Sequence, residues 1–290
     1  MIGPWVDRNG RFSALKTTVF AALFLPVIGI CVATVTGPAV ARPAIEFNHQ
    51  VGQWAIRLLM VTLAITPLRQ ILKWPKLIIV RRMIGVATFL YLVLHVSAYV
   101  VDKGFNLGAV LTEIVLRFYL TIGFGALAII AVLASTSTDG MLRRLGGKRW
   151  QKLHRTVYLA VFLGIIHYFL QKKLNVSQPT VFFGLFLWLI GYRLIFWRGG
   201  VAWATAIIPL ILLSLCAAVL TGLGEAAYFH LRLGIPPERI LHADFIFVRG
   251  PRPAWIVLFF GLGATALSIG RKLWDRRLAP ATAAASPAPR

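Results

Sequence analysis

Eight long apolar runs constrain this sequence more than any other feature. They lie near residues 17–37, 51–72, 82–101, 114–134, 153–170, 178–197, 201–224 and 253–272. An α-helix needs about 20 apolar residues to cross about 30 Å of hydrocarbon. The composition agrees, since 58% of the 290 residues are hydrophobic and only 14% are charged. We therefore predict an all-α integral membrane protein, a polytopic bundle of about eight transmembrane helices.

The basic residues are distributed unevenly between the two sides of such a bundle. The formal net charge of +22 would suggest nucleic-acid binding in a soluble protein. With a cytoplasmic N-terminus, however, 21 of the 31 Lys and Arg residues fall in cytoplasmic segments, and six of the nine acidic residues fall on the other side. This bias predicts that both termini are cytoplasmic. The charge therefore indicates membrane topology and argues against a nucleic-acid partner.

The segments between the runs leave little room for chemistry outside the membrane. The longest cover about 135–152 on the cytoplasmic side and 225–252 on the outer side, which is too short for a soluble catalytic domain. Cys31 and Cys216 lie inside apolar runs and suggest neither a disulfide nor a metal site. The first run ends near Ala39–Ala41, in small residues that a signal peptidase accepts, yet it is long for a signal sequence. Whether it is removed stays open.

Three glycine-containing stretches match the letters of a dinucleotide fingerprint, at residues 123–128, 222–227 and 261–266. That fingerprint binds a pyrophosphate only where a strand turns into a helix. These stretches lie within or at the ends of apolar runs instead. We expect their small residues to permit close packing of helices.

Three histidines lie in the apolar runs, where an ionisable side chain is costly and suggests a function: His95, His154 and His167. His95 and His167 each lie about 13 residues, or about 20 Å, outward of a basic cluster, so two helices present them at matching depth. Two facing imidazoles suit haem iron, and a bis-His haem carries single electrons. Ala160 and Gly164 could make room for the macrocycle. The alternative for each histidine is an interhelical hydrogen bond.

His154 precedes His167 by 13 residues on the same predicted helix, so about 20 Å separates them and they cannot bind one iron. At the depth of His154, the helix of His95 offers Arg81 and Arg82. Arginines suit haem propionates or a phosphate rather than iron. The alternatives are a solvated histidine and two arginines that anchor their helix at the cytoplasmic surface.

These residues stand in a pattern that resembles the haem-binding membrane subunits of the MsrPQ protein-methionine-sulfoxide reductase systems, within the wider ferric-reductase-like transmembrane family. The pattern consists of Arg81-Arg82, Tyr91-Leu-Val-Leu-His95, Tyr99, Trp150-Gln-Lys-Leu-His154-Arg155, Tyr158 and His167. The resemblance covers roughly residues 15–198.

The resemblance implies an electron-transfer subunit of an oxidoreductase complex in the bacterial inner membrane, rather than the catalytic subunit. Such a subunit binds one or two b-type haems and is associated with FMN. It takes electrons from the quinone pool or a cytoplasmic flavin reductase and passes them to a periplasmic molybdopterin-containing methionine-sulfoxide reductase. Carried over to this sequence, His95 and His167 would ligate an outer haem. His154 would serve an inner haem or the place where electrons enter; no FMN site can be placed.

The family core has six spans, whereas this chain has two more. The sequence therefore divides into a cytoplasmic N-terminal segment, a haem-binding core, an extension of two helices with an outer loop at 225–252, and a disordered cytoplasmic tail. Their predicted bounds are 1–16, 17–198, 199–275 and 276–290.

Two other functions stay open. A transmembrane ferric or oxygen reductase needs a flavin and nicotinamide domain, but only 18 residues follow Lys272, so its donor would be a separate flavoprotein. A haem-free transporter would use the histidines to bind protons or to pack helices, and acids within the spans would support it. The acids considered are Glu113 and Glu225, and both lie close to the ends of predicted spans rather than inside them.

Overall fold

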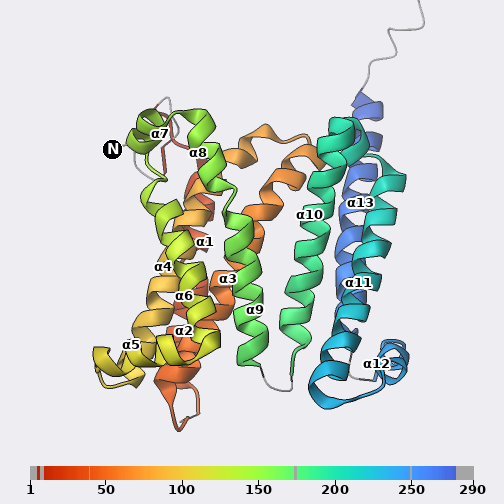
Figure 1. Cartoon of the computed structure of the whole chain (residues 1–290). Coiled ribbons are helices and arrows are strands. Elements are labelled where there is room, and N and C mark those ends of the chain that lie inside the picture. The colour runs from red at the N-terminus through yellow and green to blue at the C-terminus, as the bar shows by residue number, and fades with distance from the viewer. Residues whose placement is uncertain (1–4, 7–9, 39, 173–174, 249, 279–290) are drawn as a thin grey trace, which may run out of the picture. The chain divides into compact units, whose positions relative to one another are not determined.

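The computed structural model describes residues 5–6, 10–38, 40–172, 175–248 and 250–278, most of which lie in helices (Figure 1). Strand pairing within these ranges is limited to an isolated bridge between Val6 and Phe12. Eight helical segments of the described chain are long and apolar enough to cross a membrane: Ala14–Thr36, Pro43–Ile71, Pro75–Asp102, Phe118–Ser135, Gly147–Gln171, Ser177–Ala204, Ile207–Leu233 and Pro253–Arg277. The predicted all-α bundle of about eight spans is confirmed.

The helices form two compact units. Unit 1 comprises Met1–Ile65 and Lys76–Phe186, and unit 2 comprises Thr66–Pro75 and Leu187–Arg290. Two long helices contribute residues to both units. The predicted division of the sequence after residue 198 stays a prediction, and most of the predicted tail at 276–290 lies outside the described residues.

Unit 1 contains the helices that carry the predicted site. They are α1 (Ala14–Ala22), α2 (Leu25–Thr36), the first part of α3 (Pro43–Ile71), α4 (Ile78–Asp102), α5 (Leu107–Leu116), α6 (Phe118–Ser135), α7 (Asp139–Leu145), α8 (Gly147–His154), α9 (Val157–Gln171) and the first part of α10 (Ser177–Ala204). Helices α4, α6 and α9 run side by side, with α6 between the other two in contact (Figure 1).

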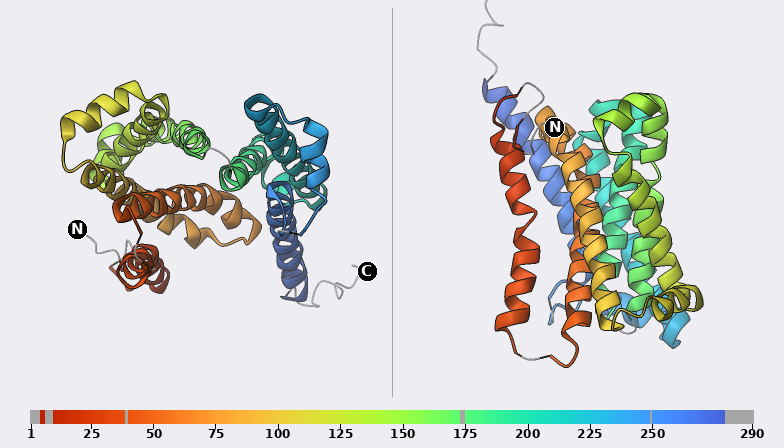
Figure 2. Two further views of the ribbon diagram at one scale, coloured as in Figure 1. Left: turned by 90° about the horizontal axis from the view of Figure 1, so that it is seen from below. Right: turned by 90° about the vertical axis from the view of Figure 1, so that its left-hand side faces the viewer.

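The first span is a helix with a break, because Pro26 lacks the N–H that would continue the hydrogen-bond ladder. The break separates α1 from α2 at Leu23 and Phe24. There the buried Tyr91 of α4 donates a hydrogen bond of 2.8 Å to the carbonyl oxygen of Leu23. A buried cluster that includes Ile30, Tyr91 and residues of α3 continues this contact, and the right-hand view of Figure 2 shows the two red helices alongside α4.

Helix α5 differs from the spanning helices, because it is short and runs across the ends of α4 and α6 (Figure 1). Asn106 caps its first turn by accepting a hydrogen bond from the amide of Ala109. Leu111, Val115 and Leu116 on its surface are exposed by 62% or more. A short helix with a strongly apolar exposed side suits a position in the membrane interface.

Unit 2 is built on the pairing of α11 (Ile207–Leu233) with α13 (Pro253–Leu278). Small residues allow the close approach: a Cβ atom added at Gly261 of α13 would collide with Ser214 of α11. Ser214 also accepts a hydrogen bond of 3.2 Å from the indole of Trp188 on α10. The short helix α12 (Pro237–Ala243) packs on α11.

The connection that follows α11 is shorter than the outer loop predicted at 225–252. Helix α11 continues past residue 224 to Leu233, where Gly234 ends it with a left-handed φ of 67°. Glu225 is therefore a buried residue of α11, with 2% of its surface exposed. It pairs with Arg252 at 2.8 Å, and Arg252 also pairs with Asp244 at 2.9 Å.

Candidate functional site

The structure brings the imidazole rings of His95 of α4 and His167 of α9 next to each other within unit 1. Their ring centroids are 6.4 Å apart and the ring planes are nearly perpendicular, at 83°. The depth matching predicted from the two basic clusters is thus realised as a direct juxtaposition. Two imidazoles at this separation are the arrangement that a bis-His metal site requires.

Each imidazole is held by a backbone carbonyl of a neighbouring helix. His95 Nδ1 lies 2.9 Å from the carbonyl oxygen of Asn48 on α3, and His167 Nδ1 lies 2.7 Å from that of Tyr119 on α6. A carbonyl oxygen can only accept, so Nδ1 carries the hydrogen and donates in both rings. This fixes the tautomer that leaves Nε2 with a free lone pair, which is the arrangement typical of metal-binding histidines.

A glycine four residues after each carbonyl makes room for the ring. A Cβ atom at Gly52 would lie 2.8 Å from His95 Nδ1, and one at Gly123 would lie 2.7 Å from His167 Nδ1. Both distances are too short for any real side chain. Two helices of different sequence thus build the same receptor for an imidazole, a carbonyl at one position and a glycine one turn later.

The spacing of the rings fits a single iron between them. In a bis-His site each bond from nitrogen to metal is about 2 Å long, and the ring centroid lies about 1 Å behind the nitrogen. The centroids of two opposed ligands are therefore about 6 Å apart. The observed distance is 6.4 Å. Gly164, one turn before His167, leaves its side of α9 open, because a Cβ atom added there would meet nothing within 4 Å. Ala160, also predicted to make room, is 1% exposed and packs in the core.

Arg57 is a further residue of this region, and it was not among the predicted site residues. It is the fifteenth of the 29 residues of α3 and so lies at the middle of a spanning helix. Its guanidinium lies 4.8 Å from the centre of the Trp54 ring and interacts electrostatically with Tyr168, the neighbour of His167. No carboxylate pairs with it in the described ranges. The sequence does contain a sign of this site, namely a lone arginine inside an apolar run. A charged side chain in lipid is costly, so its presence suggests a function.

His154 lies apart from the histidine pair and is not on the same helix as His167. A turn at Arg155 and Thr156 separates α8 from α9, which corrects the single helix predicted for both histidines. His154 stacks on the indole of Trp150 at 3.7 Å and donates from Nδ1 to the Trp150 carbonyl at 3.1 Å. Its Nε2 lies 3.3 Å from the hydroxyl of Ser137. Two of these contacts are local, so a second imidazole is not required to hold the ring.

The predicted arginine pair is close to His154. The charges of both Arg81 and Arg82 act on the His154 ring. Arg82 also forms an ion pair of 2.5 Å with Asp139 at the start of α7. The structure therefore gathers all three predicted residues at one end of unit 1, away from the His95–His167 pair.

A polar cluster links the other end of α4 to α5 and α6. Lys103 pairs with Glu113 at 2.5 Å, Tyr99 donates a very short hydrogen bond to the same carboxylate, and Arg117 lies 3.5 Å from it. The hydrogen bonds from Lys103 and then Tyr99 lower the pKa of Glu113, which keeps this carboxylate ionised. Arg117 also reaches the hydroxyl of Tyr119, whose ring lies 6.2 Å from that of His167. Polar contacts thus run from the end of α4 to the ring beside His167.

The sequence matches known proteins over most of the helices described above. Residues 51–165 match the family described as ferric reductase like transmembrane component. Three similar proteins are each named protein-methionine-sulfoxide reductase heme-binding subunit MsrQ. The protein from Rhodospirillum rubrum is 41% identical over 190 residues, which is 65% of this chain and 89% of that protein.

The other two give the same picture. The protein from Herminiimonas arsenicoxydans is 39% identical over 64% of this chain and 87% of its own length. The protein from Caulobacter vibrioides is 37% identical over 66% of this chain and 93% of its own length. No solved structure matches the chain significantly.

Proposed function

Because the chain belongs to the MsrQ family of haem-binding subunits, within the ferric-reductase-like transmembrane group, we propose that it holds a b-type haem between His95 and His167 and carries electrons across the membrane. The observation that carries the proposal is the pair of matched receptors. Each receptor holds one ring through Nδ1 and leaves Nε2 free. The centroids of the two rings are 6.4 Å apart. A bound haem would supply one-electron redox chemistry.

The chain's own residues contribute position and environment to that chemistry. The carbonyls of Asn48 and Tyr119 fix the tautomer and the orientation of the two ligands. Buried apolar side chains such as Tyr91, Val161 and Ile165 keep water away from the helix interior. Arg57 offers a positive charge that forms no ion pair with a carboxylate of the described residues, and we assign it to a haem propionate.

A second position is proposed at the opposite end of unit 1. His154 would be an axial ligand there, and Arg81 and Arg82 would bind the propionates of an inner haem or the phosphate of FMN. The support is that both arginine charges reach the histidine ring. FMN itself and the number of haems are proposed from family membership alone.

The proposed direction of electron flow combines the sidedness predicted from the basic residues with the membership of the MsrQ family. The basic ends of the spans predict that both termini are cytoplasmic, in the inner membrane of a bacterium. Electrons would enter from the quinone pool or a cytoplasmic flavin reductase. They would leave on the outer side for a periplasmic molybdopterin-containing methionine-sulfoxide reductase. The support for this acceptor is that the relatives are named as heme-binding subunits of a protein-methionine-sulfoxide reductase.

The first experiment is a reduced-minus-oxidised absorbance spectrum, with haem quantification, of the detergent-purified protein from haem-replete cells. We expect a low-spin b-type spectrum whose intensity falls strongly in both His95→Ala and His167→Ala. His242→Ala is a matched control, because this histidine lies on the outer helix α12. The spectrum should be unchanged there.

The same measurement can overturn the proposal. A wild-type protein without haem would exclude electron transfer and favour a transporter. Haem retained in full by both ligand variants would move the site elsewhere. His154→Ala separates one haem from two, since only an inner haem would lose its signal in that variant.

A further inference from the structure

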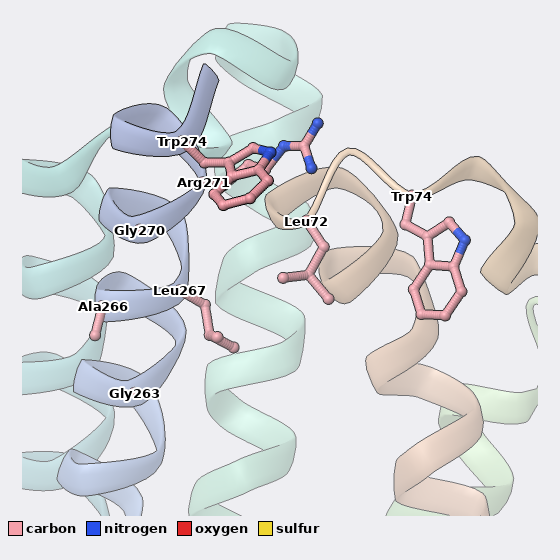
Figure 3. Close-up of a pocket in the computed structure, with 8 residues that line it drawn as sticks. All are labelled: Leu72, Trp74, Gly263, Ala266, Leu267, Gly270, Arg271 and Trp274. Carbon is pink, nitrogen blue, oxygen red and sulfur yellow. The ribbon is translucent and has the colours of Figure 1, made fainter. Parts of the chain in front are cut away.

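Unit 2 contains a groove that lies outside the proposed haem site. It runs between α13 and the connection that follows α3, and has a volume of about 570 Å³ (Figure 3). From Gly263 to Gly270, its wall on α13 consists of small and apolar residues. A Cβ atom added at either glycine would meet nothing within 4 Å, so the wall is truly open. The two glycines are seven positions apart, which is about 10 Å along the helix.

Two tryptophans stand at one end of this groove. Trp74 borders it from the connection after α3, and Trp274 borders it from α13 (Figure 3). They are 43% and 58% exposed. Tryptophans on spanning helices gather at the level of the lipid headgroups. The groove therefore extends from the headgroup level into the hydrocarbon layer.

Positive charge surrounds the same end. Residues 66–75 and 271–277 contain six basic residues and one acid, Asp275. That acid is already paired with Lys73 at 2.5 Å and with Arg271 at 3.0 Å. Arg271 lines the groove itself. Lys73 itself has a left-handed φ of 52°. Its ion pair with Asp275 therefore stabilises the turn that carries Trp74. An excess of five positive charges is left to meet an anion.

From this combination we infer that the groove binds an anionic phospholipid, with an acyl chain along Gly263 and Gly270 and the phosphate at Arg271. Basic pockets between spanning helices recognise such headgroups. A zwitterionic lipid would leave the excess charge unbalanced. A quinone would occupy the apolar wall but has no negative charge for the basic end.

The test is native mass spectrometry of the full-length protein, delipidated in detergent and titrated with phosphatidylglycerol or phosphatidylcholine. We expect clear preference for phosphatidylglycerol. Gly270→Leu should weaken its binding about tenfold, because the new side chain displaces about two methylene groups of the acyl chain. Arg271→Gln should weaken it about fivefold, the effect of one basic residue near an anionic headgroup.

Matched controls make the same changes elsewhere. Gly29→Leu places a leucine at an exposed glycine of α2 whose Cβ also meets nothing, and Arg144→Gln removes an exposed arginine of α7. Both should bind phosphatidylglycerol like the wild type, and circular dichroism checks that all four variants fold. Equal binding of the two lipids, undiminished binding by Gly270→Leu, or a quinone or second copy of the chain in the lipid's place would overturn the inference.

Discussion

Gly123 offers the sharpest test of the proposed site at the scale of single residues. In Gly123→Ala the new Cβ would lie 2.7 Å from His167 Nδ1, so the ring must leave its place against the Tyr119 carbonyl. Loss of such an outer contact commonly weakens metal affinity by about 10- to 100-fold. We expect the haem-to-protein ratio of the purified variant, measured as the pyridine haemochrome, to fall at least tenfold.

A neighbouring glycine on the same helix is the control. In Gly125→Ala the new Cβ would meet only Leu163, at an ordinary distance of 3.8 Å. This variant makes the same change of helix propensity on α6 without touching an imidazole. Equal haem content in the two variants would show that the receptor at Gly123 does not hold the ligand.

The histidines could be found from the sequence, but their receptors could not. An imidazole in an apolar run is conspicuous because its burial in lipid is costly. Gly123 was correctly assigned to helix packing rather than to a dinucleotide site. The residue that Gly123 packs against depends on the rotation of α6 relative to α9, and this rotation cannot be read from a single sequence. Arg57 was detectable too, because a lone arginine at the middle of an apolar run is costly in lipid.

At the scale of elements, the buried ion cluster that ties α11 to α13 gives a dependence on pH. Burial raises the pKa of the Asp244 carboxyl above its ordinary value of 3.8, and the pairing with Arg252 only partly opposes this. The folded state thus binds this proton more tightly than the unfolded state. The protonated Asp244 thus contributes to the free energy of unfolding. This contribution is fully present below pH 3.8 and is lost as the pH rises through the raised pKa.

The variant Asp244→Asn should remove this part of the pH dependence, because the amide can still accept from Arg252 but cannot ionise. We expect its Tm in detergent to fall less than that of the wild type between about pH 4 and about pH 7. The measurement is thermal unfolding across that range. Parallel curves for the two proteins would contradict a raised pKa at Asp244.

Element ends were predicted less well than element number. The outer loop was expected from residue 225, yet α11 continues to Leu233 because Ala and aromatic residues extend the helix until Gly234. Similarly, hydropathy alone joined α8 to α9 across the turn at Arg155 and Thr156. Apolar content reports how much chain lies in lipid, whereas helix ends depend on local backbone geometry.

At the scale of the whole molecule, the distribution of basic residues makes a prediction about sidedness. Lys148 of α8 and Arg239 of α12 are both exposed, and they belong to segments assigned to opposite sides. In a chain with Cys31→Ser and Cys216→Ser, a membrane-impermeant maleimide applied to intact spheroplasts should label Arg239→Cys but not Lys148→Cys. After lysis both should react. The reverse pattern would place both termini outside.

The number of spans could be predicted because each needs about 20 apolar residues, a property that can be read along the chain. The grouping of spans into two units could not, since it depends on contacts between helices far apart in sequence. The same limit applies to the groove beside α13: Lys73 and Asp275 meet across 202 positions.

The two histidine receptors have a consequence for protons. In each ring the only N–H hydrogen is shared with an amide carbonyl, and the remaining nitrogen is the one that would bind the proposed iron. If an iron held by these rings were reduced, neither imidazole would therefore have a free N–H to lose a proton from or a free nitrogen to take one up. Charge would cross this layer of the bundle unaccompanied, so that any proton consumed in the overall reaction must be taken up on the side where the final acceptor is reduced.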